Sequence, residues 1–261
     1  KSKPASAPEA WLKKATDRGV DFLRSDYVAI LEHMDHNIGK LVSVLKELDI
    51  SENTLIVFVS DNGGCTMEED APGGRFPGNN GPFSGGKGTT YQGGLKVPFL
   101  MNWKGRLPQG IISDDQVMHC DIYATLLDAA GIPVPEKMQG QSILPLIHGE
   151  RSSWPSEALI QISESHIGRA IRSEKWKYSV RATGKNSGQD GGSTEYVEDF
   201  LYDLEADPYE LRNLVSAESH TGICHILRQR LIDRMIESGE SAPEIQAAAK
   251  ENSGQRQISI R

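Results

Sequence analysis

Thr54-Leu55-Ile56-Val57-Phe58-Val59-Ser60-Asp61-Asn62-Gly63-Gly64 is the stretch that decides the fold of this 261-residue chain. Its first six residues form an uninterrupted apolar run, and turn-forming residues follow directly. Such a run is typical of a strand that is buried on both faces of a parallel sheet. Because ligands of open α/β sheets bind just beyond the carboxyl ends of the strands, the sequence predicts a functional site at residues 60–64.

Asp61 and Asn62 are the two residues of this stretch whose side chains could bind a metal at the strand end. A carboxylate and an amide side by side offer hard oxygen donors, and the two glycines that follow give the backbone freedom. This combination suits a divalent cation such as Ca²⁺ or Mg²⁺. The alternative is an ordinary Asp-Asn-Gly turn with no ligand, which is a common way to end a strand.

The elements on either side of this strand predict an α/β core. A continuous apolar stripe predicts a helix over residues 27–48 that packs against that core. Residues 97–103 read as a second buried strand, and a helix is expected from Asp121 to Ala130, where Gly131 ends it. We therefore predict an α/β fold, part of a doubly wound and mostly parallel sheet. The stripe consists of Tyr27, Leu31, Met34, Ile38, Leu41, Leu45 and Leu48.

After about residue 155 the pattern changes to short strands close together, at residues 158–162, 169–172, 176–180 and 199–204. A helix is expected near residues 219–238, followed by a polar stretch. Strands grouped before a helix are typical of a small α+β subdomain with an antiparallel sheet. The predicted domains are the α/β core at 1–155, the α+β subdomain at 156–240 and a loosely held polar tail at 241–261.

Composition excludes some classes of function. A hydrophobic fraction of 38%, a charged fraction of 25% and a net charge of −8 are ordinary for a globular protein and argue against a nucleic-acid binder. No apolar run is long enough to span a membrane, so we expect no membrane partner. Cys65, Cys120 and Cys224 are too scattered for a disulfide framework or a zinc cluster, and they leave the compartment open.

Residues 61–96 hold 11 glycines in 36 positions, against an average usage of about 7%. Lys87 lies among these glycines in Gly85-Gly86-Lys87-Gly88, where a cation and backbone N–H groups can meet an anion. The segment from Gly81 to Lys87 fits the start of a phosphate-binding P-loop. We reject that interpretation because Gly88 replaces the required hydroxyl residue and no helix is expected to follow. The alternative for Lys87 is a solvated loop lysine.

A cation site at Asp61 and Asn62, together with Lys87, suits a tetrahedral oxyanion. The metal would withdraw charge from one oxygen and the lysine from another, as transfer of a phosphoryl-type group requires.

At this point the chain resembles the sulfatase family of the alkaline phosphatase-like superfamily. The resemblance begins with the hydrophobic strand that ends in Ser-Asp-Asn-Gly and runs in order from about residue 27 to 215. Further segments typical of the family are Gly85-Gly86-Lys87-Gly88, Gly93-Gly94-Leu95-Lys96-Val97-Pro98-Phe99, Asp121-Ile122-Tyr123-Ala124-Thr125-Leu126-Leu127, Gly140-Gln141-Ser142-Ile143-Leu144-Pro145-Leu146 and Leu201-Tyr202-Asp203-Leu204 with Asp207-Pro208, Glu210 and Asn213-Leu214.

The resemblance implies a role for each candidate residue. Asp61 and Asn62 would be two ligands of a divalent metal, usually Ca²⁺ in this family, with Mg²⁺ as the other option. Lys87 would contact the sulfate and act in catalysis, and His166 would reach the substrate, although a plain strand-edge histidine is the alternative. The implied substrate is a sulfated small molecule or carbohydrate. The implied compartment is the periplasm or the exterior, which nothing in the chain itself establishes.

One departure from the family pattern is large. Sulfatases use a formylglycine made from Cys or Ser in a Cys/Ser-x-Pro-x-Arg motif, and this chain has no such motif. Cys65-Thr66-Met67-Glu68-Glu69 lacks both the proline and the arginine. The paired N-terminal aspartates of the family and its upstream Lys and His residues have no counterpart either. We therefore expect a C-terminal fragment of a sulfatase, inactive alone, whose nucleophile lies outside this chain.

Two other functions remain open from the sequence. One is a related phosphatase, phosphodiesterase or phosphonate hydrolase of the same superfamily, with a different nucleophile or a second metal. The other is a non-catalytic binding domain derived from a sulfatase. For a truncated sheet, we also expect self-association, because exposed apolar strand edges pair with other chains.

Overall fold

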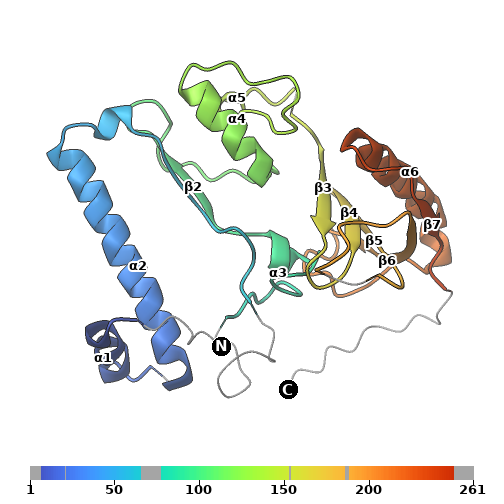
Figure 1. Ribbon diagram of the computed structural model, residues 1–261, viewed down its shortest axis with the longest axis horizontal. Coiled ribbons are helices and arrows are strands. Elements are labelled where there is room, and N and C mark those ends of the chain that lie inside the picture. Colours follow the sequence, from blue (N-terminus) through green and yellow to red (C-terminus); the bar gives the residue numbers. More distant parts are fainter. Residues whose placement is uncertain (1–6, 21, 66–77, 153, 186–187, 250–261) are drawn as a thin grey trace. The chain divides into compact units, whose positions relative to one another are not determined.

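The computed structural model describes residues 7–20, 22–65, 78–152, 154–185 and 188–249, which form a mixed α/β fold (Figure 1). The chain divides into two compact units. Unit 1 comprises Lys1–Val59, Cys65–Asn79 and Pro98–Ile111, and unit 2 comprises Ser60–Gly64, Asn80–Val97 and Ile112–Arg261. The predicted α/β class is confirmed, whereas the predicted domain boundaries at residues 155 and 240 stay a prediction.

Unit 1 contains a pair of helices and a pair of strands. Helices α1 (Glu9–Asp17) and α2 (Phe22–Glu47) pack together through small side chains, of which Ala15 and Ala29 are fully buried. The short 3-10 helix η1 (Ser51–Asn53) leads into strand β1 (Ile56–Val59), and strand β2 is Phe99–Asn102. The long helix and both strands confirm the elements that the sequence predicts.

The pairing of β1 differs from the prediction. β1 and β2 run antiparallel, with Ile56 opposite Asn102 and Val59 opposite Phe99, and form a two-stranded sheet. Parallel neighbours need a crossover of a dozen or more residues, usually a helix, and the described part of the segment between these strands has only one helical turn. Phe58 is 37% exposed, so the prediction of a strand buried on both faces in a parallel sheet was wrong.

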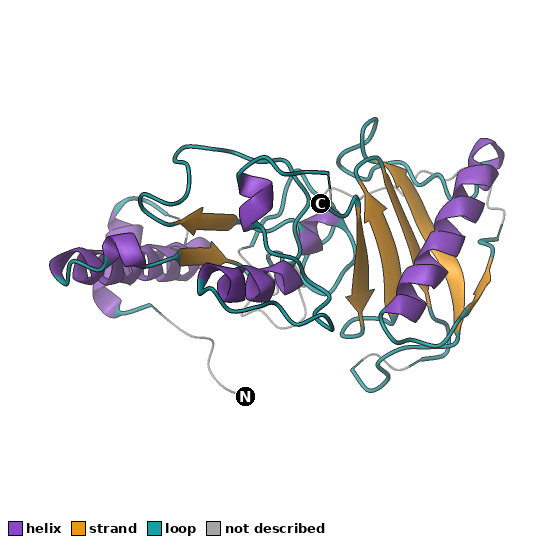
Figure 2. Cartoon of the chain, turned by 90° about the horizontal axis from the view of Figure 1, so that it is seen from above, coloured by secondary structure: helices purple, strands orange, loops and turns teal. Residues whose placement is uncertain are grey.

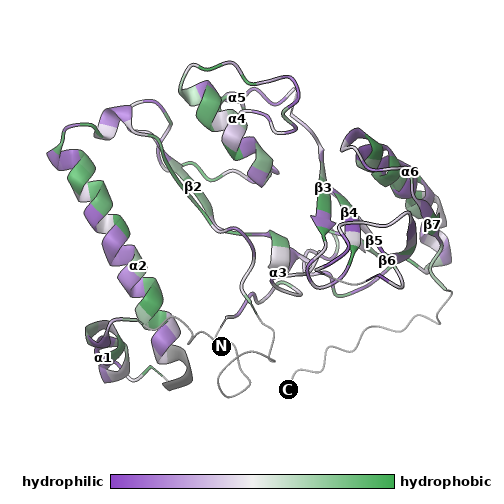
Figure 3. Cartoon of the chain, in the orientation of Figure 1, coloured by the Kyte–Doolittle hydropathy of each residue, from purple (hydrophilic) through white to green (hydrophobic). Residues whose placement is uncertain are grey.

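The apolar stripe of α2 is exposed, which corrects the expectation that this helix packs against a core. Leu41 is 67% exposed, and Tyr27, Leu31 and Met34 of the same stripe are exposed as well. Figure 3 shows the apolar residues recurring along α2. The helix forms as its periodicity predicts, but the described residues of unit 1 do not cover this face.

Unit 2 is built on a five-stranded sheet in the order β3-β4-β5-β6-β7. The strands are β3 (Glu157–Ile162), β4 (Gly168–Ser173), β5 (Trp176–Arg181), β6 (Glu195–Asp203) and β7 (Glu244–Gln246). The first four pair antiparallel, as predicted, and β7 joins β6 in parallel. Helix α6 (Thr221–Glu237), after the short 3-10 helix η2 (Glu218–His220), lies across one face of the sheet (Figure 2).

The face of the sheet under α6 forms the main core of the described chain. Its buried side chains are large and come from both layers. They include Ile171, Tyr178, Val180, Tyr196, Leu201, Leu227, Leu231 and Met235. Strand β7 lies within the stretch that the sequence predicts to be a loose tail. Ile245 anchors it, since that side chain is only 9% exposed. Residues 250–261 of the predicted tail lie outside the described residues.

Three short or medium helices complete unit 2: α3 (Gln92–Leu95), α4 (His119–Ala129) and α5 (Leu144–Ile147). Helix α4 begins two residues before the predicted start at Asp121. The Asp121 carboxylate accepts hydrogen bonds from Met118 N at 2.7 Å and Gln141 N at 2.9 Å, and burial raises its pKa. None of the helices in the described parts has the length and apolarity that a membrane crossing needs.

Candidate active site

The residues directly after β1 belong to unit 2, where side chains from distant segments hold their backbone. His119, in the first turn of α4, places its Nε2 atom 2.8 Å from the Ser60 carbonyl oxygen. Asn80 brackets Gly64 from both sides: its Oδ1 accepts from Gly64 N at 2.9 Å and its Nδ2 donates to Gly64 O at 2.8 Å. The strand end therefore has a defined conformation rather than that of a free turn.

Gly63 packs directly on helix α3. Its N–H donates to Gly94 O at 2.9 Å, and a Cβ added at this position would lie 1.7 Å from Gly93 O. Only glycine permits this close approach of two backbones. Gly63 is thus required by the contact between the strand end and the glycine-rich loop.

Within the described parts of the chain, Asp61 and Asn62 both have side-chain oxygen atoms without a hydrogen-bond partner. Among the described residues, no hydrogen bond or ion pair engages the exposed Asp61 carboxylate. Asn62 donates its Nδ2 to Gly63 O at 2.8 Å, which leaves its Oδ1 without a partner in the same part of the chain. Two adjacent oxygen ligands with no competing donors fit a divalent cation.

The two oxygens make only part of a metal site. Ca²⁺ takes six to eight oxygen ligands and Mg²⁺ takes six. No group of three or more His, Cys, Asp or Glu side chains that would hold a metal exists among the described residues. The remaining ligands of such a cation would have to come from water, substrate or residues other than those described.

Lys87 lies beside the strand end through its backbone. Its N–H donates to Gly64 O at 3.1 Å, and Asn80 Nδ2 also donates to Gly85 O at 3.1 Å, so one side chain ties the two segments together. The Lys87 ammonium lies 4.0 Å from a carboxylate oxygen of Glu164, and its side chain is 39% exposed. At that distance and exposure the ion pair is weak, and the ammonium is available to an anion.

His166 joins the same cluster through its neighbour Ser165. The Ser165 hydroxyl donates to Gly88 O, and His166 Nδ1 lies 3.0 Å from Ser165 Oγ. The hydrogen bond between Ser165 Oγ and His166 Nδ1 therefore tethers the imidazole to the Gly88 segment. Burial, with a smaller effect of Arg181, lowers the pKa of His166. The structure thus links the backbone segments that carry Asp61, Asn62 and Lys87, and Ser165 connects His166 to the Lys87 loop, but no hydrogen bond or ion pair joins the four side chains among the described residues.

The glycine-rich loop contains one element that the sequence does not predict. Residues 92–95 form the single turn of α3, where an uninterrupted run into the strand is expected. Gly93 N donates to Ser84 O at 2.8 Å, so α3 folds back against the Lys87 loop. Gly85 and Gly88 have φ angles of +74° and +83°, which favour glycine. The rejection of a P-loop still follows from Gly88.

Sequence reasoning missed several residues that shape this site. His119 carries no pattern signal, because it bonds to the backbone of Ser60, 59 positions away in the chain. Glu210 appears in the sequence only as part of a family motif, yet its carboxylate accepts from Gln92 N at 2.7 Å. Only the position of Asn80 within the glycine-rich stretch pointed to a role.

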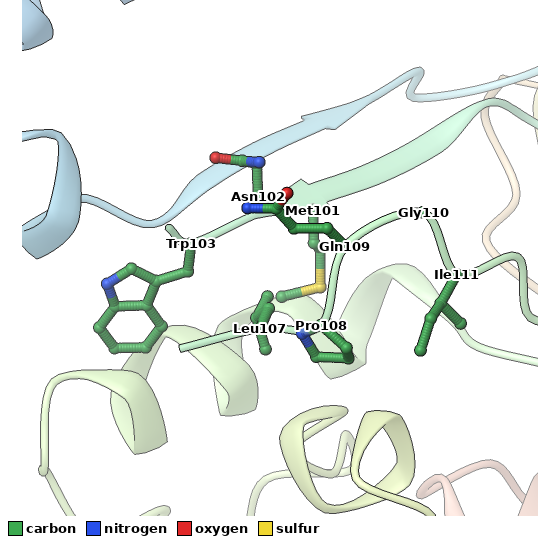
Figure 4. Close-up of a pocket in the computed structure, with 8 residues that line it drawn as sticks. All are labelled: Met101, Asn102, Trp103, Leu107, Pro108, Gln109, Gly110 and Ile111. Carbon is green, nitrogen blue, oxygen red and sulfur yellow. The ribbon is translucent and has the colours of Figure 1, made fainter. Parts of the chain in front are cut away.

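A separate hollow of about 260 Å³ lies in unit 1, at the end of β2 (Figure 4). It holds none of the predicted site residues, and its lining carries no ionisable group, so it offers no hydrolytic chemistry. The lining residues are Met101, Asn102, Trp103, Leu107, Pro108, Gln109, Gly110 and Ile111.

Two family models match the chain. The model described as sulfatase matches residues 4–132, and the model described as the C-terminal part of N-sulphoglucosamine sulphohydrolase matches residues 84–237. The two matches overlap across the Lys87 loop and α4. Together they cover all four predicted site residues.

Curated relatives agree with the family models. The chain is 28% identical to human steryl-sulfatase over 241 residues, which is 84% of this chain and 41% of that protein. It is 37% identical to N-acetylgalactosamine-6-sulfatase of the dog, Canis lupus familiaris, over 128 residues, which is 48% of this chain and 24% of the relative. The chain therefore spans less than half the length of these curated relatives.

The fold also matches solved structures. BT4656, solved in complex with its substrate D-glucosamine-2-N,6-O-disulfate, aligns with a TM-score of 0.65 at 24% sequence identity. The alignment covers 84% of this chain and 41% of BT4656. At that identity the match speaks for the fold alone, and the family models carry the assignment. This chain belongs to the sulfatase family.

Proposed function

We propose that this chain is the C-terminal part of a sulfatase and that the complete protein hydrolyses sulfate esters. The observation that carries the proposal is the hydrogen bond from Lys87 N to Gly64 O, with Asn80 bonded to both segments. It keeps an available ammonium on the same network as the free oxygens of Asp61 and Asn62. A tetrahedral anion with negative oxygens is the ligand that suits a cation and a lysine together.

Asp61 and Asn62 are the proposed ligands of a divalent metal, Ca²⁺ first and Mg²⁺ as the alternative. The metal, when bound, would withdraw charge from a sulfate oxygen. The Asp61 carboxylate supplies a negative charge to the cation. The Asn62 amide is oriented by the hydrogen bond that its Nδ2 donates to Gly63 O.

Lys87 is the proposed catalytic residue of this chain. Its ammonium would contact the sulfate and stabilise the charge that grows as the S–O bond breaks, an electrostatic effect of the oxyanion-hole kind. His166, joined to Gly88 through Ser165, is the proposed contact to the rest of the substrate. BT4656, which shares the fold, binds a sulfated glucosamine, and this supports a sulfated carbohydrate as substrate.

The nucleophile in this proposal is a formylglycine outside the chain, since the sequence lacks the motif from which it is made. The isolated 261-residue chain should therefore release no sulfate. It should also bind Ca²⁺ no more tightly than about 1 mM, as expected for a site with few charged ligands. Calorimetry that gave micromolar binding to the isolated chain would contradict this part of the proposal.

The class of substrate is tested on the complete protein with matched esters of one phenol or sugar. We expect turnover of an aryl sulfate or a sugar sulfate, and at least about tenfold slower turnover of the corresponding phosphate and phosphonate esters. Preferential hydrolysis of a phosphate or phosphonate ester would favour the related hydrolases of the superfamily. Absence of turnover with every ester would favour a binding domain.

The metal site is tested by Asp61→Asn in the complete protein, with Asp35→Asn on exposed α2 as the matched control. Removing the carboxylate charge should raise the Ca²⁺ concentration that gives half-maximal activity by about tenfold or more. The control should match the wild type. Equal Ca²⁺ dependence of wild type and Asp61→Asn would remove Asp61 from the metal site.

A further inference from the structure

A fully buried ion pair lies beneath the glycine-rich loop. Lys177 on β5 and Glu210 have no exposed side-chain surface, and Lys177 Nζ lies 2.5 Å from Glu210 Oε1. Removing two charges from water costs several kcal/mol for each ion, by order of magnitude. Hydrophobic residues of similar size are often at least as stabilising at such a position, so stability alone does not account for the pair.

The second oxygen of Glu210 makes a contact that reaches the candidate site. Glu210 Oε2 accepts a hydrogen bond from Gln92 N at 2.7 Å, in a buried environment. Gln92 begins α3, and the N–H groups of a first helical turn have no partner within the helix. The carboxylate thus satisfies a buried backbone donor that would otherwise be left without an acceptor.

Helix α3 is hydrogen-bonded both to the Lys87 loop and to the strand end that carries Asn62. Gly93 N donates to Ser84 O at 2.8 Å, next to the Lys87 turn. Gly94 O accepts from Gly63 N at 2.9 Å, next to Asn62. A shift of α3 would therefore displace the lysine loop and the metal-binding strand end together.

Further contacts join the glycine-rich loop to β6 and to the segment of Tyr209 and Glu210. Tyr91 stacks on Phe200 of β6 with ring centroids 5.1 Å apart, and Lys177 Nζ lies 5.7 Å from that ring. Ser84 Oγ donates to Tyr209 O at 2.8 Å. Glu210 itself has a φ of +59°, a conformation that is uncommon for a residue with a side chain. The segment of Tyr209 and Glu210 thus accepts two hydrogen bonds from the loop, one from Ser84 and one from Gln92.

The electrostatics agree with a pair held in place by its surroundings. Burial lowers the pKa of Lys177 to about 8, against the attraction of Glu210, which raises it. Arg172, on the neighbouring strand, has a pKa lowered by burial and also feels the Glu210 charge. The Glu210 carboxylate thus interacts electrostatically with two buried basic side chains, of which Lys177 is in direct contact with it.

We propose that Glu210, oriented by Lys177, is a positioning residue. It holds α3 in place and thereby fixes the positions of Lys87 and Asn62 relative to each other. This inference rests on the proposed function, because the relative position of Lys87 and Asn62 matters only if these residues act together. Neither Glu210 nor Lys177 touches the reacting groups. Their effect on turnover would come from the geometry of the loop, where a displacement of about 1 Å can cost about 100-fold in rate.

The test separates the hydrogen bond to Gln92 N from the burial of charge. Glu210→Ala alone would strand the Lys177 ammonium and is prone to unfold. Two double variants of the complete protein avoid this, Lys177→Met/Glu210→Gln and Lys177→Met/Glu210→Met. Both remove the ion pair, but only the first keeps an acceptor oxygen for Gln92 N.

Hydrogen exchange of the peptide over residues 90–97 is the first measurement. We expect near-native protection in the Gln variant and at least about tenfold faster exchange in the Met variant. Glu198→Gln is the matched control, since Glu198 is a buried carboxylate of the same sheet that bonds Tyr178 and Arg228. It should leave exchange at 90–97 unchanged. Equal exchange in the two double variants would overturn the proposal.

Turnover of a sulfate ester is the second measurement. In the Met variant kcat should fall about 10- to 100-fold while KM changes less, because Lys87 acts on developing charge. The Gln variant should keep kcat within about threefold. A wild-type protein inactive on every ester would refute the proposed function, whereas the exchange result would still decide the role of Glu210. Normal kcat in a Met variant with fast exchange would overturn the link to catalysis.

Discussion

The two units of the chain differ in whether the apolar face of their main helix is covered. In unit 2, α6 covers a face of the five-stranded sheet, and Leu231 and Tyr178 are fully buried. In unit 1, α2 has an equally regular apolar stripe, yet Leu41 is 67% exposed. The same residue types at the same helical spacing thus have different surroundings. Periodicity predicts the helix, but it does not predict what covers the helix.

The candidate site belongs to the well-packed unit. Asp61, Asn62, Lys87 and His166 all fall within unit 2, although Asp61 lies only two residues after the end of β1, a strand of unit 1. The glycine-rich segment that carries Lys87 is hydrogen-bonded to Ser165, in the loop between β3 and β4, and to Glu210, whose carboxylate pairs with Lys177 of β5. A site of this kind benefits from a rigid support, because catalytic geometry tolerates only small displacements. The following experiments test whether the two units differ as described.

The largest expected effect is on stability, for one substitution made in both units. Leu231→Ala should lower the free energy of unfolding by about 2–5 kcal/mol, since it leaves a cavity in the α6–sheet core. Leu41→Ala should change it by less than about 0.5 kcal/mol. Urea unfolding at low protein concentration measures both. Similar losses at the two positions would mean that α2 is packed in solution.

The buried ion pair of unit 2 predicts a pH dependence. The pKa of Lys177 is lowered from 10.5 to about 8, so folding releases a proton between these pH values. The unfolded state then binds more protons, and stability rises with pH by as much as about 3 kcal/mol across this window. The effect is read as the difference in unfolding free energy between wild type and Lys177→Met/Glu210→Gln. A flat difference from pH 7 to 10 would contradict the shift.

A smaller effect is expected on association. We propose that the isolated chain self-associates through exposed apolar surface such as the α2 stripe. Leu41→Glu should weaken association in sedimentation experiments by about tenfold, and Lys40→Glu, a charged neighbour outside the stripe, serves as the control. A monomeric wild-type chain at 100 μM, roughly the top of a usual concentration range, would refute self-association.

Local patterns predicted most elements of the chain. The helical period of the α2 stripe, the continuous apolar runs of β1 and β2 and the short apolar segments of the second sheet each identify their element. Strand β7 has no such signal, because Ile245 is its only apolar residue and its formation depends on the free edge of β6. The antiparallel pairing of β1 with β2 could not be predicted from the local sequence either, since it depends on the path of the chain between the two strands.

The candidate site was predictable only in part. Asp61, Asn62 and Lys87 stand out because they lie among glycines after a strand, a local feature. The bond from Glu210 to Gln92 N spans 118 positions of sequence and joins a side chain to a backbone group. No pattern within a window reports such a contact. The same holds for His119 and Ser60, which lie 59 positions apart.

Sulfate release by the complete protein tests the central claim most directly, with Lys87→Met compared against Lys96→Met. Both lysines belong to the same glycine-rich segment, but Lys96 is exposed and lies over the Phe83 ring, 5.1 Å from its centroid. We predict that Lys87→Met lowers kcat by about 100- to 1,000-fold, as loss of one stabilising donor does. Lys96→Met should stay within about threefold of wild type. Equal kcat in the two variants would contradict the assignment of Lys87.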